Sequence, residues 1–505
     1  MPPWLRRVIA FATATRPRRI FFGLGAIGFV CGSALGVAIL YVLFPPPPWQ
    51  YAEPVRIETG MVQGMLGDGF TLYRGIPYAA PPLGDLRWRA PQAAKPWAGV
   101  LRAEAFKRVC MQEGSTIPGF MPEPMSEDCL YLNVWTPAKS ATEKLAVMVY
   151  LFGGGNVTGS GSARLYWGDQ LVRDGVIIVT LNYRLGVLGS LALPELTRES
   201  GTSGNYQLKD EIAALSWVKR NIAAFGGDPD NITIFGQSAG AHQESNLMAS
   251  PRARGLFHRV IAHSGGAFAP SDTEWGLMTL QTAERAGTEF AAAMGAKTLA
   301  ELRAIPAEKL LTVPYRSRPV VDGDIVPADA YDLYSAGQEQ DVPLLLGYNG
   351  DEMEMPYKWP MYTWARLHAQ HATSKTYFYH FTQVPPFGPF PRTGAGHGAE
   401  LIYVFGYPPA ILHRVVEWPA AAKRHIHLGE EIRAYWTNFV KHGDPNGAGL
   451  PMWPAFNEGG KVQILDDDIT QTDMPDMTAH TAMDAEMAAA RQSRNAAASN
   501  NTTAP

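Results

Sequence analysis

A serine between two glycines is the first feature of this sequence that suggests chemistry. Ser238 lies in Gly-Gln-Ser-Ala-Gly (236–240), after the strand-like run 232–235 and before a helix-prone stretch. A nucleophile at a sharp strand-to-helix turn projects from the backbone, and the flanking glycines let neighbouring segments approach it. The N–H groups at the start of the helix can stabilise a developing oxyanion. The pattern predicts that Ser238 is the nucleophile of an acyl-transfer enzyme.

A run of glycines can supply the other half of the oxyanion site. Residues 153–155 are all glycine and follow the apolar, strand-like run 145–152. Without side chains, such a loop can turn its backbone N–H groups toward a single point. We expect the N–H groups of Gly154, Gly155 and Ala239 to form the oxyanion hole.

An acid and a histidine are expected after the serine in chain order. His397 lies in the glycine-rich stretch TGAGHGAELIYVFG, where its ring could reach a neighbouring strand end. Asp351 and Glu352 both follow the strand-like run 342–348, at the sheet edge where active sites gather. The residues alone do not choose between these two acids. Neither His368 with His371 nor His425 with His427 has a supporting carboxylate or cysteine cluster, so we expect no metal and no other cofactor.

The elements that must position these residues alternate between strand and helix. The runs 145–152, 175–183, 231–235, 259–264 and 342–348 are short, apolar and rich in β-branched residues, as in strands buried on both faces of a parallel sheet. Between them, residues 207–225 carry apolar residues at helical spacing. The alternation predicts an α/β fold with a mostly parallel central sheet flanked by helices.

The two ends of the chain differ from this catalytic domain, which we assign to residues 54–466. Residues 1–44 contain five arginines, no acidic residue and an apolar run from 20 to 44, which predicts a transmembrane anchor with the rest of the chain on the periplasmic or extracellular side. A cleaved signal and secretion is the alternative. Residues 45–53 are a proline-rich spacer. Residues 467–505 contain few large apolar residues and are expected to be disordered.

Cysteine use and composition agree with this organisation. Cys110 and Cys129 should form a disulfide on the oxidising side of a membrane. The net charge is −4 and 46% of the 505 residues are apolar, which describes an ordinary folded protein and makes a nucleic-acid partner improbable. The oligomeric state cannot be inferred from the sequence.

Several long motifs, in order, resemble the type-B carboxylesterases, the cholinesterase-like group of the α/β-hydrolase fold. The resemblance spans roughly residues 54 to 460. It is carried by RGIPYAAPPLGDLRW (74–88), SEDCLYLNVWTP (126–137), FGGG (152–155), NYRLG (182–186), the stretch 204–240, GYNGDE (347–352), GHGAELIYVFG (396–406) and YWTNFVKHGDPN (435–446).

The resemblance implies a hydrolase of small-molecule carboxylic esters and assigns roles to individual residues. It makes Ser238 the nucleophile, Glu352 the acid, His397 the base and Ser264 a hydroxyl that helps to hold the acid. It pairs Cys110 with Cys129, and it implies structural salt bridges of Arg87 with Glu127 and of Arg184 with Asp210. A catalytically inactive adhesion domain on the same fold is the rival interpretation, although such proteins typically lose the triad that this sequence retains. A lipase or an amidase with the same triad is a further alternative.

The sequence departs from the family pattern at three places. Gln237 replaces the cholinesterase glutamate before the nucleophile, and Gly119 with Phe120 replaces a tryptophan, so choline esters are disfavoured. Phe152 and Asn156 replace the usual residues of the oxyanion loop. The span from Glu352 to His397 is shorter than in relatives, which predicts a shortened helical cap, an open gorge and tolerance of bulky or long-chain esters.

Overall fold

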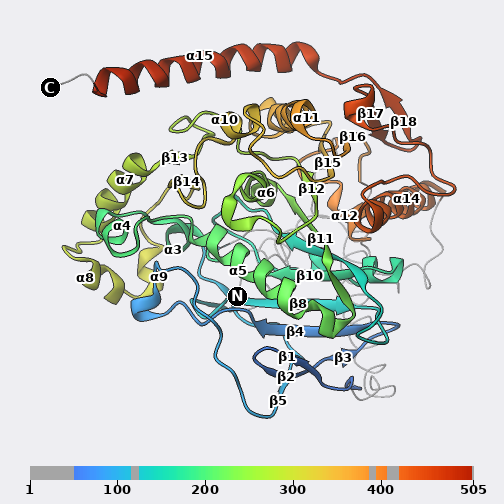
Figure 1. Ribbon diagram of the computed structural model, residues 1–505, viewed down its shortest axis with the longest axis horizontal. Helices are drawn as coiled ribbons and strands as arrows, with labels where there is room; N and C mark the ends of the chain where they lie inside the picture. The colour runs from blue at the N-terminus through green and yellow to red at the C-terminus, as the bar shows by residue number, and fades with distance from the viewer. Residues whose placement is uncertain (1–49, 115–123, 386–393, 407–419, 503–505) are drawn as a thin grey trace, which may run out of the picture. The chain divides into compact units, whose positions relative to one another are not determined.

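The central sheet has antiparallel edges around a parallel core (Figure 1). Six neighbouring pairs, from β10 through β9, β11, β12, β15 and β16 to β17, are parallel. In spatial order the strands are β18 (Thr470–Thr472), β17 (Val462–Leu465), β16 (Thr376–Phe381), β15 (Leu344–Asn349), β12 (Arg259–His263), β11 (Gly227–Gln237), β9 (Leu145–Leu151), β10 (Ile177–Leu181), β8 (Tyr131–Thr136), β4 (Thr71–Pro77) and β3 (Met65–Leu66).

This computed structural model describes residues 50–114, 124–385, 394–406 and 420–502. The predicted anchor of residues 1–44 lies outside these ranges, as do residues 45–49 of the spacer. Within the described ranges, no helix combines the length and the apolar character needed to cross a bilayer.

The buried strands correspond to the apolar runs of the sequence. The runs 145–152, 175–183, 231–235, 259–264 and 342–348 become β9, β10, β11, β12 and β15, and every residue of β10 and β15 is buried. Strands covered on both faces need apolar residues at successive positions, because alternate side chains point to opposite faces. The predicted α/β architecture is confirmed.

Helices cover both faces of the sheet, as two successive residues of β11 demonstrate. A Cβ at Gly236 would lie 2.8 Å from Gly240 C, so α6 packs directly over that face. The next side chain back, Phe235, points the other way and packs against Phe405, just after α12, with ring centroids 5.6 Å apart. The larger helices are α5 (Tyr206–Asn221), α6 (Ala239–Ala249), α7 (Leu280–Ala293), α11 (Trp359–His371), α14 (Ala420–His442) and α15 (Met477–Thr502).

Short elements complete the domain. The short helices are α3 (Gly186–Ser190), α4 (Pro194–Ser200), α8 (Leu299–Ala304), α9 (Ala307–Leu310), α10 (Ala330–Ser335) and α12 (Leu401–Val404). In the described ranges, three small sheets pair β1 (Val55–Ile57), β2 (Gly60–Gln63) and β5 (Val100–Arg102); β6 (Val109–Cys110) and β7 (Met125–Ser126); and β13 (Met278–Thr279) and β14 (Val320–Val321).

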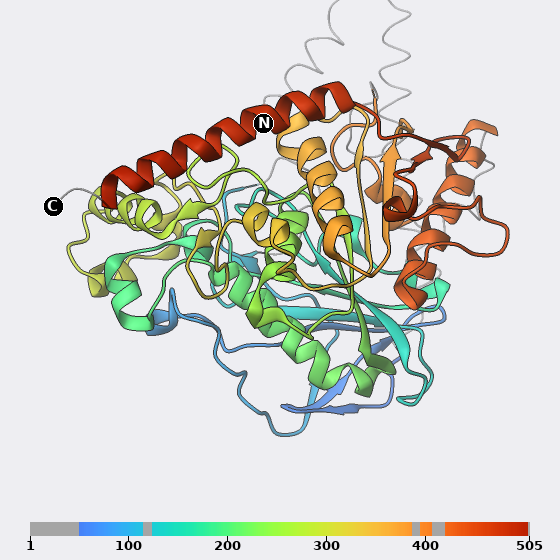
Figure 2. The ribbon, with the colours of Figure 1, turned by 45° about the horizontal axis from the view of Figure 1, so that its top comes forward.

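The predicted disorder of residues 467–505 does not hold over residues 467–502, the part of this segment that the structure describes. β18 pairs with β17, and α15 runs along α10 and α11, as both ribbon views show (Figures 1 and 2). The helix is held by polar contacts rather than by a broad apolar face: Trp359 Nε1 donates to Asp484 at 2.9 Å, and Arg494 pairs with Asp329. The prediction relied on the scarcity of large apolar residues. An alanine-rich helix needs few such residues when polar contacts hold it to the domain.

The covalent and ionic framework matches the predictions. Cys110 and Cys129 form a disulfide. Arg87 pairs with Glu127 at 2.5 Å, and the fully buried pair of Arg184 with Asp210 is 2.7 Å apart.

Candidate active site

Ser238 occupies the sharp turn between β11 and α6. Its φ of 59° and ψ of −120° are a strained combination for a residue other than glycine. The turn is held because Ser238 N–H donates to His263 O at 2.9 Å, while Ser238 O accepts from His242 N at 3.0 Å. A Cβ at Gly240 would lie 2.0 Å from Leu151 O, so glycine is required there for close packing. The structure thus has the strand-turn-helix context predicted for a nucleophile.

The glycine loop after β9 lies against this serine. A Cβ at Gly153 would be 3.0 Å from Ser238 Cβ. Gly154 and Gly155 have φ values of 117° and 65°, which turn the backbone in a way that side chains disfavour. Among the described residues, no acceptor is recorded for the N–H groups of Gly154, Gly155 and Ala239, so all three remain available to an oxyanion.

Two unusual residues of this loop have structural roles. The Phe152 ring stacks on Tyr183 with centroids 4.2 Å apart, and Tyr183 Oη donates to Phe152 O at 2.6 Å. Asn156 is buried and accepts from Gln243 Nε2 of α6 at 2.9 Å. Both substitutions therefore fix the loop to its neighbours.

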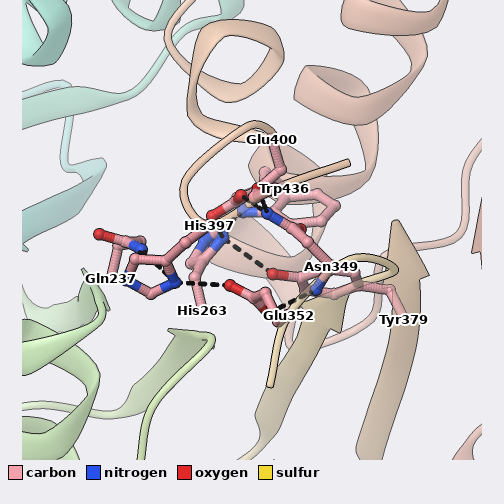
Figure 3. A network of polar contacts seen from close by, with 9 residues as sticks. Gln237, His263, Asn349, Glu352, Tyr379, His397, Glu400 and Trp436 are labelled. Atoms are coloured by element: carbon pink, nitrogen blue, oxygen red, sulfur yellow. Dashed lines mark hydrogen bonds and ion pairs between the residues drawn. The ribbon is translucent and has the colours of Figure 1, made fainter. Parts of the chain in front are cut away.

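The structure chooses between the two candidate acids. Glu352 Oε1 lies 2.5 Å from His397 Nδ1 (Figure 3). The Asp351 side chain is instead exposed, and the backbone N–H of Asp351 donates to Ala395 O. The Glu352 carboxylate is inaccessible, while the His397 side chain retains 31% of its exposure. A buried acid behind a partly exposed imidazole is the arrangement that a general base needs.

Ser238 and His397 are not directly bonded in this structure. In the described part of the chain, no hydrogen bond joins Ser238 Oγ to the imidazole. The neighbouring residue Gln237 does contact that ring, with its Nε2 3.0 Å from His397 Nε2 and 3.5 Å from Nδ1 (Figure 3). Base and nucleophile therefore lie in one neighbourhood, and such bonds often tighten only once substrate binds.

A buried polar network behind Glu352 was not anticipated from the sequence. Asn349, the last residue of β15, donates its N–H to Glu352 Oε2 at 2.8 Å. Its side-chain amide donates to Gly396 O at 2.8 Å and to Glu400 Oε2 at 2.5 Å. One residue therefore holds both the acid and the loop that carries the base (Figure 3).

The far end of this network fixes one histidine tautomer. His263 Nε2 accepts from Trp436 Nε1 at 3.2 Å, so its proton lies on Nδ1, which faces Tyr379 Oη at 3.0 Å and Glu400 at 3.3 Å. Burial opposes ionisation of Glu400, but the nearby His263 and the hydrogen bond from Asn349 outweigh it and lower the pKa of that carboxyl. Glu400 is therefore a buried anion that anchors Asn349.

The role predicted for Ser264 is corrected. Ser264 Oγ is buried and has no hydrogen-bond partner among the described residues, and the Asn349 N–H occupies the acid's second oxygen instead. The serine follows β12 directly and has a φ of 49°.

One further titratable group lies near the site. His242 is one turn along α6 from Ser238, and burial, Arg318 and His397 together lower its pKa to about 4. It is therefore neutral at physiological pH. Over the described ranges, no three histidine, cysteine or acidic side chains gather as a metal site would require.

Comparisons with known proteins identify the family of the chain. The carboxylesterase family model matches residues 52–357 and 353–485. The chain belongs to the carboxylesterase family. Fumonisin B1 esterase of Sphingopyxis macrogoltabida is 33% identical, over 90% of this chain and 93% of its own length. Human carboxylesterase 5A is 31% identical, over 83% and 87% respectively.

Solved esterase structures have the same fold as this chain. A thermophilic pNB esterase superposes with a TM-score of 0.76 at 30% identity, covering 85% of this chain and 99% of the esterase. This carboxylesterase accordingly has an α/β-hydrolase fold and is a serine carboxylesterase that acts on small-molecule esters.

Proposed function

We propose that this carboxylesterase hydrolyses esters through Ser238, His397 and Glu352 by way of an acyl-enzyme. The 2.5 Å contact between Glu352 and His397, next to a strained serine turn, is the observation that carries the proposal. Glu352 orients the imidazole so that its Nε2 can accept a proton, and it stabilises the imidazolium that results.

The proposed cycle has two symmetric halves. The Ser238 hydroxyl proton moves to His397 Nε2 while Oγ bonds to the ester carbon, and the carbonyl electron pair moves onto the oxygen facing Gly154, Gly155 and Ala239. The intermediate collapses, His397 returns the proton to the departing alcohol, and the acyl group remains on Ser238. Water then repeats the sequence and releases the acid.

A fluorophosphonate probe with matched variants tests the triad. The wild type should be labelled at Ser238 and hydrolyse p-nitrophenyl acetate. Ser238→Ala should lose labelling and fall to background, while His397→Gln and Glu352→Gln should lose about three or more orders of magnitude in kcat. Ser271→Ala, which removes another buried hydroxyl, is the control and should be labelled normally. Labelling that persists in Ser238→Ala would refute the proposal.

The substrate range is proposed from the short span between Glu352 and His397. We expect long and bulky esters to be accepted, because a shortened cap leaves the gorge more open. Rates on p-nitrophenyl acetate, octanoate and palmitate measure this directly, and strict preference for the acetate would reject it. The relative named fumonisin B1 esterase makes fumonisin B1 worth including in the panel.

We also propose that residues 1–44 anchor the enzyme with its catalytic domain on the outer side of a membrane. The disulfide between Cys110 and Cys129 supports an oxidising compartment. Carbonate extraction of membranes should leave the full-length protein in the pellet, whereas a chain starting at residue 45 should be released. Release of the full-length protein at a reduced mass would instead indicate a cleaved signal.

A further inference from the structure

The aromatic ring of Tyr357 lies against one face of the His397 imidazole. The ring centroids are 3.9 Å apart and the planes differ by 27°, which is a stacked arrangement. Tyr357 belongs to η6 (Glu354–Lys358), the turn that follows the acid Glu352. The acid and the stacking ring therefore come from one short segment, while the base comes from another.

The carboxamide of Gln237 covers the opposite face. The Nε2 lone pair lies in the plane of the imidazole and points away from it. A donor bonded to this lone pair would therefore be much farther from Nδ1 than from Nε2. The nearly equal distances from Gln237 Nε2, 3.0 Å to Nε2 and 3.5 Å to Nδ1, therefore put the amide over the ring. Since Tyr357 occupies one face, the amide covers the other.

The imidazole is thus restrained at two faces and one edge. Glu352 holds the Nδ1 edge at 2.5 Å. The in-plane direction of Nε2 is left for the proton of Ser238. This arrangement restricts the ring from tilting or flipping while it leaves its reactive nitrogen accessible.

We propose that Tyr357 is a positioning residue for hydrolysis, whose π face orients the His397 ring and stabilises the imidazolium formed when His397 takes the Ser238 proton. A cation above an aromatic face is stabilised by the ring quadrupole. The stabilisation grows as charge develops on the imidazole, so it favours the transition state over the resting enzyme. This inference rests on the proposed role of His397.

The turn that presents Tyr357 is fixed from outside the active site. Glu354 pairs with the fully buried His480 of α15, and Lys358 Nζ lies 3.0 Å from Asp476 Oδ2. Both ties flank Tyr357 within η6. The C-terminal helix consequently holds the ring that stacks on the base.

The Tyr357 side chain adds no charge of its own to the stack with His397. Burial and the nearby Glu352 raise the pKa of Tyr357, so its phenol is un-ionised at the pH of an esterase assay. The titratable groups recorded around His397 are Glu352, Tyr357 and His242. Of these, Glu352 bonds the Nδ1 edge of the ring, while Tyr357 and His242 bring no charge to it at neutral pH.

Substitution of Tyr357 separates its aromatic face from its hydroxyl. Tyr357→Leu should lower kcat by roughly 3- to 30-fold with little change in KM. It should also move the acidic limb of the kcat/KM profile to lower pH, because the imidazolium loses a stabilising partner. Tyr357→Phe keeps the face and should remain within about twofold of the wild type. If Tyr357→Leu does not fold, Tyr357→Met makes the same test with more of the volume retained.

Tyr51→Leu is the matched control, because Tyr51 also has a cation, the Arg102 guanidinium, over its ring and pairs with Met65 of β3, at the end of the sheet opposite β18. It should leave both kcat and the pH profile unchanged. Wild-type kcat and profile in Tyr357→Leu, a change in KM alone, or an equal loss in Tyr357→Phe would each overturn the inference. Those results would leave fluorophosphonate labelling of Ser238 intact, whereas failure of the triad would appear as labelling that survives Ser238→Ala.

Discussion

At the scale of single residues, the site depends on side chains that never touch the substrate. Asn349 bonds the acid through its backbone and the loop of the base through its side chain. Both hydrogen bonds come from Asn349, so this single residue at the end of β15 sets the distance between Glu352 and His397. Such supporting contacts commonly decide whether a catalytic pair keeps its geometry.

Replacing Asn349 should therefore impair catalysis without removing a reacting group. In Asn349→Ser the backbone bond to Glu352 remains, but the amide bonds to Gly396 and Glu400 are lost and Glu400 is left as a less well satisfied buried anion. We expect a loss of about 1–3 kcal/mol in unfolding free energy and at least a tenfold loss in kcat. Denaturant titration and p-nitrophenyl acetate kinetics measure the two effects. An exposed control, Asn457→Ser, should change kcat little, and equal kcat in both variants would contradict the role of Asn349.

The sequence predicted the reacting residues more completely than their supports. Ser238, His397 and the acid pair are recognisable because the motif or the order along the chain is informative. His263, Asn349 and Glu400 are far apart in sequence and unremarkable individually, so only the folded arrangement brings them together. Tyr357 escaped notice for the same reason, since a stack between two loops leaves no periodic signal.

At the scale of elements, β15 and the C-terminal helix cooperate in presenting the acid. β15 ends at Asn349, and η6 begins two residues after Glu352. α15 then holds η6 through His480, whose ring also stacks on Tyr362 with centroids 4.7 Å apart. Strands buried on both faces were predictable from β-branched runs. The placement of α15 was not, because it depends on individual polar partners rather than on an apolar stripe.

Loss of the His480 tie should weaken both the fold and the catalytic step. His480→Ala removes the partner of Glu354 and opens a small cavity under Tyr362, so we expect a loss of about 1–3 kcal/mol in stability. The freed turn should also lower kcat, though less than Tyr357→Leu does. Thr481→Ala, on the exposed side of the same helix, is the control for both thermal unfolding and kinetics. A destabilised but fully active His480→Ala would separate α15 from catalysis.

At the scale of the whole molecule, two buried acids lie between α5 and α6 beneath the serine turn. Glu211 and Glu244 are fully buried, and none of their carboxylate oxygens has a hydrogen-bond partner among the described residues. Burial raises the pKa of both, with Asp210 adding to the effect on Glu211 and Glu211 to that on Glu244. The pKa values of Glu211 and Glu244 are higher in the folded state than in the unfolded state. These two groups therefore favour the folded state fully at low pH, and this stabilisation is lost as the pH rises.

Glu244→Gln should remove the part of the stability loss at rising pH that ionisation of Glu244 causes. The amide has the same shape and no charge, so the variant should gain stability over the wild type by about 1–3 kcal/mol at pH 9, and by less at pH 5. Thermal unfolding across this range measures the difference. Glu289→Gln, an exposed position on α7, should show no comparable trend. A variant whose melting temperature parallels the wild type at every pH would contradict the assignment.

The disulfide has a practical consequence for anyone who handles the protein. Cys110 and Cys129 close a covalent ring around the intervening residues. A protease that cuts once within this ring would leave both fragments joined, so the sample would migrate as an intact chain on an electrophoresis gel until thiol was added. Running each preparation with and without reductant would therefore reveal nicked enzyme that an ordinary purity check overlooks.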